Sequence, residues 1–370
     1  MQDADLARLF TPIRVNGITL PNRFIMPAMQ RGWCDDGIPF PQLADYYRRR
    51  VVGGASLIIG ESAAIDHVSA TAQKRACRLN EASASMWQSC VAAVHDAGGH
   101  MLLQLWHEGA FRFDDDGQTV SPSGLAHSGL ARGRAATAED LAGLIEGYVR
   151  SARLAQQLGA DGVELHCAHG FLLDQFLWAE TNRRDDGYGG PDIAARARFP
   201  AEIVAAIRAA CGPNFVISLR FSQWKEADYD AKIAMTLDEL ATLTGIFRAA
   251  GVDMLHASTR RFWLPEWPGS ERTLAGCTRD VAGLPVAAVG SVGLDRDVMA
   301  SFASDEEAQP RVAETLARLK KGAAEQEFDL ISVGRSLIGD PEFVNKVRDC
   351  RLAEIRPFQR SDIDEFEWEH

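Results

Sequence analysis

Eight short apolar runs recur along the whole 370-residue chain, and they constrain its fold more than any other feature. Most of them are separated by segments in which apolar residues recur with helical spacing. Strands that alternate with amphipathic helices are typical of a parallel α/β sheet, and eight such units predict a closed (β/α)8 barrel of the TIM-barrel type. The predicted strands are residues 24–26, 56–60, 101–106, 163–166, 216–221, 254–257, 286–289 and 330–333.

Two local signals agree with a barrel. Residues 12–20 alternate around Asn16-Gly17, which predicts a β-hairpin that would cap the N-terminal mouth. Thr137 is followed three residues later by Asp140, a capping box at the start of the helix after the third strand. The rival architecture is an open, doubly wound sheet, and it is disfavoured because no GxGxxG motif follows an early strand.

The composition predicts one intracellular domain. Hydrophobic residues make up 46% of the chain, enough for a sizeable core, and we expect a single domain over 1–370 with a barrel at about 22–348 and a tail at 349–370. The net charge of −12 argues against nucleic acid and anionic membranes as partners. The seven cysteines never form CxxC, and the N-terminus lacks a secretory pattern. We therefore expect a soluble, cytoplasmic protein, with a homodimer expected by analogy alone.

A pair of histidines follows the fourth predicted strand. His166 and His169 lie three residues apart at its carboxyl end, where they can aim two N–H donors at one small oxygen. An isolated pair could equally be satisfied core histidines. A metal site is the weaker interpretation, because no third His or Cys ligand lies nearby at a usual spacing.

Small residues follow the last two predicted strands and indicate a phosphate site. Turns without bulky side chains let backbone N–H groups approach a phosphate, and an arginine adds charge-assisted hydrogen bonds. Many barrels bind phosphate at this place, although each turn alone could be a plain connection. The turns contain Gly290, Ser291 and Val292 after the seventh strand, and Gly334 and Arg335 after the eighth.

Several ordered motifs together resemble one family. The segment HxAHGFLLxQFL…TNRRxDxYGG, with FIMPAMQR, QLWHEG and a terminal GRxLIxDP, is similar to the Old Yellow Enzyme family of flavin-dependent ene-reductases. The resemblance extends from residue 9 to about residue 346. It implies a TIM barrel that binds FMN non-covalently and takes hydride from NAD(P)H.

The resemblance also implies roles for individual residues. Arg220, within the run VISLRF, would face the N1 edge of the flavin, although a salt bridge to a barrel carboxylate is the alternative. Gln104 would contact the pyrimidine edge of the flavin, or else satisfy backbone groups of the barrel. The remaining expected cofactor contacts are Pro27, Ala28, Met29 and Gln30 along the ring, Ser62 after the second strand, and the phosphate turns at Gly290, Ser291, Val292, Gly334 and Arg335.

Two long polar segments are candidate lids over the site. Residues 107–136, which include an acidic run at 114–116, lack helical periodicity, and a loop of this length in a compact domain is usually functional. Residues 260–269 form the second candidate. We expect the substrate pocket to be lined by Phe171, Trp106 and Trp263.

The chain departs from the family pattern at three places. Phe171 stands where the family has a tyrosine that donates a proton, Gln30 replaces the usual Thr or Cys beside the flavin, and Ala110 replaces an arginine. The first change removes the usual proton donor. The second leaves open how the flavin potential is tuned.

These features together predict an enzyme that reduces the C=C bond of an activated alkene, such as an enone, enal or nitroalkene. His166 and His169 would be catalytic, holding the substrate oxygen while hydride passes from the flavin to the β-carbon. Reductases of the dienoyl-CoA or amine dehydrogenase type are an alternative, but we expect no iron–sulfur cluster because only Cys350 lies near the end. A flavin-binding protein that has lost catalysis is the third interpretation.

Overall fold

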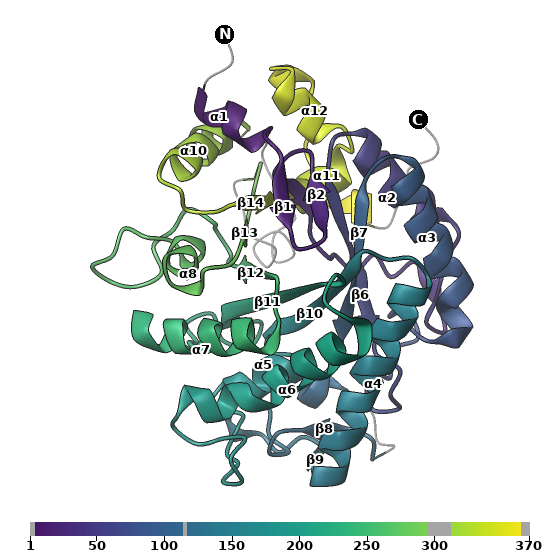
Figure 1. Cartoon of the computed structure of the whole chain (residues 1–370), viewed down its shortest axis with the longest axis vertical. Helices are drawn as coiled ribbons and strands as arrows, with labels where there is room; N and C mark the ends of the chain where they lie inside the picture. Colours follow the sequence, from purple (N-terminus) through teal and green to yellow (C-terminus); the bar gives the residue numbers. More distant parts are fainter. Residues whose placement is uncertain (1–3, 114–116, 295–311, 364–370) are drawn as a thin grey trace.

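Residues 4–113, 117–294 and 312–363 are described by this computed structural model. Eight parallel strands pair in the order β3-β6-β7-β10-β11-β12-β13-β14 and close into a barrel, which confirms the predicted fold (Figure 1). Each predicted strand is present, and three of them run several residues beyond their predicted carboxyl ends. The strands are β3 (Phe24–Met26), β6 (Leu57–Ala64), β7 (His100–Trp106), β10 (Gly162–His169), β11 (Val216–Lys225), β12 (Met254–Ser258), β13 (Val286–Val289) and β14 (Leu330–Ser332).

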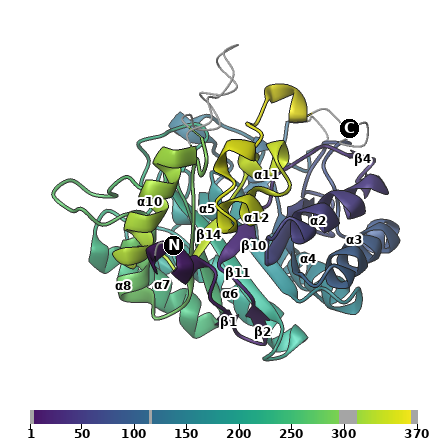
Figure 2. The same ribbon diagram turned by 90° about the horizontal axis from the view of Figure 1, so that it is seen from above.

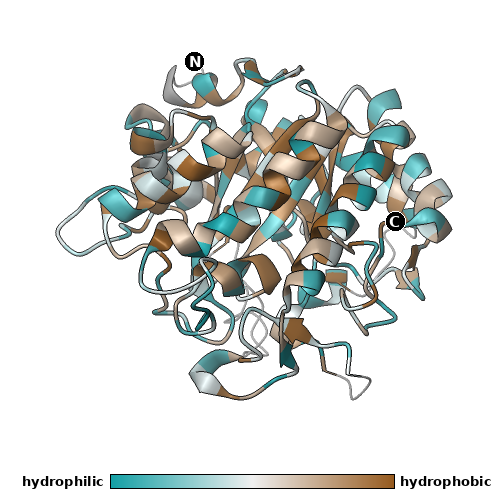
Figure 3. Cartoon of the chain, turned by 60° about the horizontal axis from the view of Figure 1, so that its bottom comes forward, coloured by the Kyte–Doolittle hydropathy of each residue, from teal (hydrophilic) through white to brown (hydrophobic). Residues whose placement is uncertain are grey.

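Amphipathic helices surround the barrel, and hydrophilic and hydrophobic residues alternate along them (Figure 3). In α4 the side chains of Leu141, Leu144 and Tyr148 are buried, and Thr137 caps the helix by accepting from the backbone N–H of Asp140, as predicted. These outer helices are α2 (Gln42–Val52), α3 (Ala84–Asp96), α4 (Ala138–Gln157), α6 (Ile193–Cys211), α7 (Leu237–Ala250), α8 (Leu274–Ala282) and α10 (Val312–Ala324).

A hairpin closes the N-terminal end of the barrel. Strands β1 (Ile13–Val15) and β2 (Ile18–Leu20) pair antiparallel around Asn16-Gly17, which confirms the predicted cap (Figure 1). Three of their side chains are buried against inward-facing apolar residues of the barrel strands. Burial of each such side chain stabilises the fold by roughly 1.5–3 kcal/mol. The buried hairpin residues are Val15, Ile18 and Leu20.

Short elements decorate both ends of the barrel. Helix α1 (Ala4–Leu9) lies beside α10, where Arg8 donates to the carbonyl of Ala323 (Figure 2). The segment after β7 contains β8 (Val120–Ser121) and β9 (Arg134–Ala135), which pair with each other, while residues 114–116 lie outside the described part. The other short elements are β4 (Cys34–Asp35), β5 (Ile38–Pro39), α5 (Leu172–Leu177), α11 (Arg335–Gly339) and α12 (Phe343–Arg348).

The described part of the tail folds back onto the barrel. Phe358 is buried against Leu294 and Ile338, and Arg356 forms an ion pair with Asp362. The 3-10 turn at Arg360–Ile363 brings the chain to the carboxyl ends of the strands. The sequence analysis predicted only a C-terminal tail at 349–370.

In the parts of the chain that the structure describes, no helix combines the length and the apolar character that a membrane crossing requires.

Candidate active site

A cavity of about 420 Å³ opens at the carboxyl ends of the barrel strands. The carboxyl-terminal parts of β6 and β7 and the loops that follow β3, β10, β11, β12, β13 and β14 contribute to its wall, as expected for a barrel enzyme. All but two of the residues predicted for the site line this cavity. They are Pro27, Ala28, Met29, Gln30, Ser62, Trp106, His166, His169, Phe171, Arg220, Gly290, Ser291, Val292, Gly334 and Arg335.

The two other predicted residues lie elsewhere. Gln104 is fully buried below the cavity, where it accepts from Ser62 Oγ and donates to Glu164 at 2.8 Å. Gln104 is therefore connected to the cavity only indirectly, through its hydrogen bond with Ser62, which lines the cavity. Trp263 is not among the lining residues, and its ring instead packs edge-on against Phe262 and beneath the guanidinium of Arg318.

The two predicted histidines contact each other. Nε2 of His166 lies 2.9 Å from Nδ1 of His169, and both side chains are buried. His169 has a left-handed backbone, with φ of 65°, at an irregularity where β10 and β11 change register. The turn is held because the His169 N–H donates to Ser222 Oγ at 2.9 Å and the Gly170 N–H donates to Asp174 at 2.7 Å. This strained turn directs both rings into the cavity.

Both histidines are neutral at neutral pH. Burial, together with the charge of Arg220, lowers the pKa of His166 to about 3. Burial, Arg220 and His166 also hold the pKa of His169 well below its usual value. A neutral imidazole carries one N–H donor and one acceptor, so each ring offers a single hydrogen to a ligand.

Arg220 leaves part of its guanidinium without a partner. Its Nη1 donates to the carbonyl of Ala28 at 3.2 Å and its Nη2 to Ser258 Oγ at 3.3 Å. Its Nε is buried and has no hydrogen-bond partner. Among the described residues Arg220 forms no ion pair, so the salt bridge considered from the sequence is not found. The group is suited to an anionic or carbonyl-rich ligand in the cavity.

A layer of buried polar side chains lies directly below the histidines and Arg220. Glu164 is its centre, because it accepts from Gln104, from Ser218 Oγ at 2.9 Å and pairs with His256 Nδ1 at 2.8 Å. Burial raises the pKa of Glu164, but His256, Arg220 and Gln104 outweigh burial and bring this pKa down to about 2. The ionised carboxylate therefore balances the charge of Arg220 inside the barrel.

The sequence contains a pattern that indicates this polar layer. Side chains two residues apart on a strand point to the same face. Glu164 precedes His166 by two residues, Ser218 precedes Arg220 by two, and a polar residue likewise lies two before the end of β12. Polar residues at alternate positions within otherwise apolar runs thus mark the inner face near the site.

The turns after β13 and β14 face the cavity with their backbone. Gly290 has φ of 153°, and a Cβ at this position would lie 2.6 Å from the carbonyl oxygen of Thr259. Only glycine therefore lets the chain pass this close to the loop after β12. Ser291 Oγ donates to the carbonyl of Arg260 at 2.8 Å, which fixes the same loop against the turn.

Several other lining residues, among them Trp224, Glu226 and Ile363, were not predicted, whereas Ser258 directly follows the predicted strand 254–257. The indole of Trp224 lies against the ring of His169, with centroids 4.7 Å apart, and Ser258 Oγ lies 2.8 Å from His169 Nε2. Glu226 follows β11, and Ile363 comes from the tail. The positions of these side chains depend on how the loops and the tail fold back onto the barrel. The alternation of strands and helices in the sequence does not predict this.

Phe171 takes part in an aromatic cluster at the cavity wall. Its ring contacts His166 at 4.9 Å, Trp106 at 5.4 Å and Phe111 at 5.5 Å between centroids, all in edge-on arrangements. Ala110, where the family has an arginine, is buried and its N–H donates to Gln175. Neither departure leaves an acid beside His166 in this wall.

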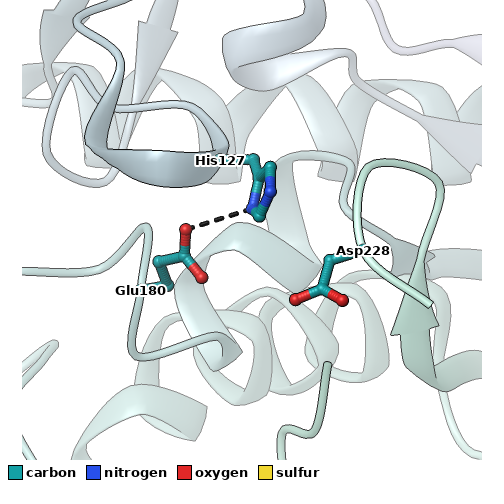
Figure 4. Close-up of side chains that lie close together, drawn as sticks. All are labelled: His127, Glu180 and Asp228. Carbon is teal, nitrogen blue, oxygen red and sulfur yellow. Dashed lines mark ion pairs between the residues drawn. The ribbon is translucent and has the colours of Figure 1, made fainter. Parts of the chain in front are cut away.

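A separate group of possible ligands lies among the loops (Figure 4). His127, Glu180 and Asp228 are partly exposed, and one ligand atom of each lies within 4.8 Å of the others. His127 Nδ1 forms an ion pair with Glu180 at 3.0 Å, and its ring stacks on Trp178. The group lies between the segment after β7 and the loops after β10 and β11, and its His127–Glu180 contact is within ion-pair distance.

Comparison with known proteins finds a matching family and several relatives. Residues 8–313 match the sequence model of the NADH:flavin oxidoreductase / NADH oxidase family. The chain is 32% identical to an NADH oxidase of Thermoanaerobacter brockii, over 94% of this chain and 52% of that protein. It is 30% identical to an NADPH dehydrogenase of Halalkalibacterium halodurans, over 77% of this chain and 83% of that protein. The chain thus spans about half the length of the first relative.

Solved structures agree as well. Morphinone reductase in complex with tetrahydroNAD superposes with a TM-score of 0.76 at 27% identity, covering 96% of this chain and 93% of that chain. An Old Yellow Enzyme homologue from Zymomonas mobilis has a TM-score of 0.75 at 24% identity, covering 96% of both chains, and supports the fold. With the strand order, the histidine pair and the arginine in place, the chain belongs to the NADH:flavin oxidoreductase / NADH oxidase family, as a member of the Old Yellow Enzymes.

Proposed function

We propose that this protein binds FMN non-covalently in the cavity, takes hydride from NADH or NADPH, and reduces the C=C bond of an activated alkene. The observation that carries the proposal is the neutral, buried pair His166 and His169 beside a buried arginine nitrogen that has no partner. All residues that line the cavity belong to the barrel, its loops and its tail. We therefore also propose that the chain acts as a single catalytic domain.

The residues around the cavity fit a flavin mononucleotide. The unpaired Nε of Arg220 suits the carbonyl and anionic edge of a reduced isoalloxazine. Ser62, backed by Gln104, would meet the same polar edge, and residues 27–30 would lie along the ring. The narrow turns at Gly290 and Gly334, with Arg335, would hold the phosphate. When bound, the flavin supplies the hydride chemistry, and the protein supplies orientation and electrostatics.

The histidines would bind the substrate oxygen. Their facing nitrogens, Nε2 of His166 and Nδ1 of His169, lie 2.9 Å apart, so one oxygen that replaces their mutual hydrogen bond would contact both. Negative charge develops on a carbonyl or nitro oxygen as hydride reaches the β-carbon. Donors aimed at such an oxygen typically contribute ~10²–10³ in rate. The two rings would thus both orient the alkene and polarise it.

Phe171 has no proton to give, so the α-carbon needs another source. We propose that water supplies this proton through the open side of the cavity. Trp106 and Phe171 would shape the pocket. Strongly activated alkenes, such as nitroalkenes, need little acid assistance and would be the better substrates.

Denaturation of the purified protein tests the cofactor directly. We expect a yellow protein that releases FMN and not FAD, and an Arg220→Ala variant that holds FMN more weakly. Ser56→Ala is a matched control, because this buried hydroxyl bonds the carbonyl of Phe24 at the other end of the barrel. A colourless protein that cannot be reconstituted with FMN would contradict the proposal.

Turnover of NADH or NADPH with an enone distinguishes an ene-reductase from a protein that binds flavin without catalysis. An ene-reductase should consume NADH or NADPH in the presence of a simple enone and form the saturated ketone. A protein that only binds the flavin would stay reduced, or would not be reduced at all.

A further inference from the structure

Ser258 connects Arg220 to one of the two histidines. It is the last residue of β12 and is buried, and its Oγ lies 3.3 Å from Arg220 Nη2 and 2.8 Å from His169 Nε2. Its position is fixed from two sides. The β12–β13 ladder pairs it with Val289, and its carbonyl accepts from the indole N–H of Trp224 at 3.1 Å. The backbone of Ser258 is therefore held in place, and its Oγ contacts both neighbours from this fixed position.

The donors and acceptors at Ser258 can be counted. A guanidinium only donates, so Ser258 Oγ must accept from Arg220. The hydroxyl carries one hydrogen of its own, and His169 Nε2 is its only acceptor among the described residues. If Nε2 carried the ring hydrogen instead, the oxygen would receive two hydrogens and its own would stay unpaired in a buried place. That arrangement is the costly one.

We propose that Ser258, oriented by Arg220, fixes His169 as the tautomer with its hydrogen on Nδ1. The Nδ1–H then points at His166 Nε2 and at the place where a substrate oxygen would contact both rings. Ser258 is thus a positioning residue, since it acts through His169. The use of this N–H in substrate binding rests on the proposed function, whereas the tautomer itself does not.

The two histidines differ in how firmly their hydrogens are held. His169 Nδ1–H donates to His166 Nε2 in this structure, which places the hydrogen of His166 on Nδ1. That nitrogen is buried and has no partner. The proton on His166 Nδ1 can therefore leave without breaking a hydrogen bond, whereas a proton gained at Nε2 replaces the hydrogen bond from His169. When an oxygen approaches, His169 is already a donor, and His166 becomes one by this exchange.

The tautomer can be measured on the intact protein by nitrogen NMR of histidine labelled with 15N. Protonated and bare ring nitrogens have well separated shifts, and His169→Ala identifies the signal. We expect His169 to carry its hydrogen on Nδ1 in the wild type and in Ser258→Thr, which keeps the hydroxyl. In Ser258→Ala a substantial share should move to Nε2. Ser56→Ala, which removes a remote buried hydroxyl, should leave the tautomer unchanged.

Two results would overturn the assignment. One is a wild-type His169 with its hydrogen on Nε2, which needs no variant to fold. The other is an Nδ1 hydrogen that persists fully in a folded Ser258→Ala.

A second readout links the tautomer to binding. In the FMN-loaded protein, Ser258→Ala should weaken the binding of a para-substituted phenol about tenfold, the effect of one lost hydrogen bond to a charged group. Ser258→Thr should restore it, and unchanged phenol affinity in Ser258→Ala would contradict the role. If the protein takes up no FMN while His169 still carries its hydrogen on Nδ1, the proposed function fails and the tautomer assignment stands.

Discussion

The two ends of the barrel are built from the same strands but for different purposes. Along β11 the inward-facing residues are Val216, Ser218 and Arg220, which change from apolar to polar to charged. On β12, Met254 belongs to the apolar cluster at the N-terminal end, whereas Ser258 lines the cavity. The N-terminal layer is sealed by the hairpin, and the layer at the carboxyl end faces the cavity. On each of these strands, an inward-facing residue that stabilises the fold and one that lines the cavity are therefore only four residues apart.

The two layers differ in whether they contain buried polar atoms without hydrogen-bond partners. The N-terminal layer packs apolar side chains of the hairpin, such as Val15 and Leu20, against those of the barrel strands. Among the described residues of the upper layer, several buried nitrogens have no partner, including His166 Nδ1, Arg220 Nε and Trp106 Nε1. Such groups are costly for folding and are typical of sites that a ligand completes.

The largest effect is expected at the sealed end. Leu20→Ala removes a fully buried side chain of the hairpin and should lower the free energy of unfolding by about 2–5 kcal/mol. Chemical denaturation measures this loss, with exposed Val52→Ala as the control. The FMN content of the folded fraction should not change. Loss of FMN binding without loss of stability would break the separation of the two ends.

The next effect is at the open end. His166→Ala and His169→Ala should each weaken binding of a para-substituted phenol and slow enone reduction by ~10²–10³, because a donor to the developing oxyanion is gone. Both variants should lose less stability than Leu20→Ala. Titration of the long-wavelength charge-transfer band gives the phenol affinity, and His95→Ala on the surface of α3 is the control. Variants that bind phenol as tightly as the wild type would make the pair structural.

A smaller effect concerns pH. His166 has a folded pKa of about 3, below the usual 6.5, because burial and Arg220 disfavour its charged form. Below pH 6.5 the unfolded chain binds a proton at this residue and the folded chain does not. Stability is therefore lost as the pH falls from 6.5 towards 3, by about 1.4 kcal/mol per pH unit. Unfolding measured between pH 7 and 5 should show a shallower loss in His166→Gln than in the wild type.

The smallest effect concerns the proton donor. Phe171→Tyr places a phenol beside His166, where it could protonate the α-carbon. We expect at most about a tenfold gain with weakly activated enones and little change with nitroalkenes, which serve as the internal control. The wild-type oxidative half-reaction with enones should show a solvent isotope effect. Equal rates on every substrate, with no isotope effect, would mean that Phe171 only shapes the pocket.

The sequence predicted the barrel well because each strand centre is an apolar run that only burial on both faces explains. It was less accurate where strands become polar. Strands β10 and β11 extend to His169 and Lys225, and their last residues are polar because they form the cavity wall and a buried ion pair between Lys225 and Asp174.

The site residues were predicted best where a motif and a strand end coincide, as at His166 and Arg220. The prediction failed for side chains whose distance from the cavity depends on their depth in the barrel. It also failed for residues of a segment that folds back onto the barrel. Gln104 lies one layer below the cavity, Trp263 turns away from it, and Ile363 comes from a tail without periodicity. No short-range pattern encodes these distances.

The central claim is that the open end of this barrel reduces activated alkenes with a bound flavin. It is tested most directly by mixing the anaerobically reduced protein with enones and nitroalkenes in a stopped-flow instrument. We predict that the flavin absorbance returns in a single turnover, with one saturated product per flavin, and that His169→Ala slows this step at least a hundredfold. A protein that stays reduced with every alkene tested, while oxygen reoxidises it, would contradict the claim.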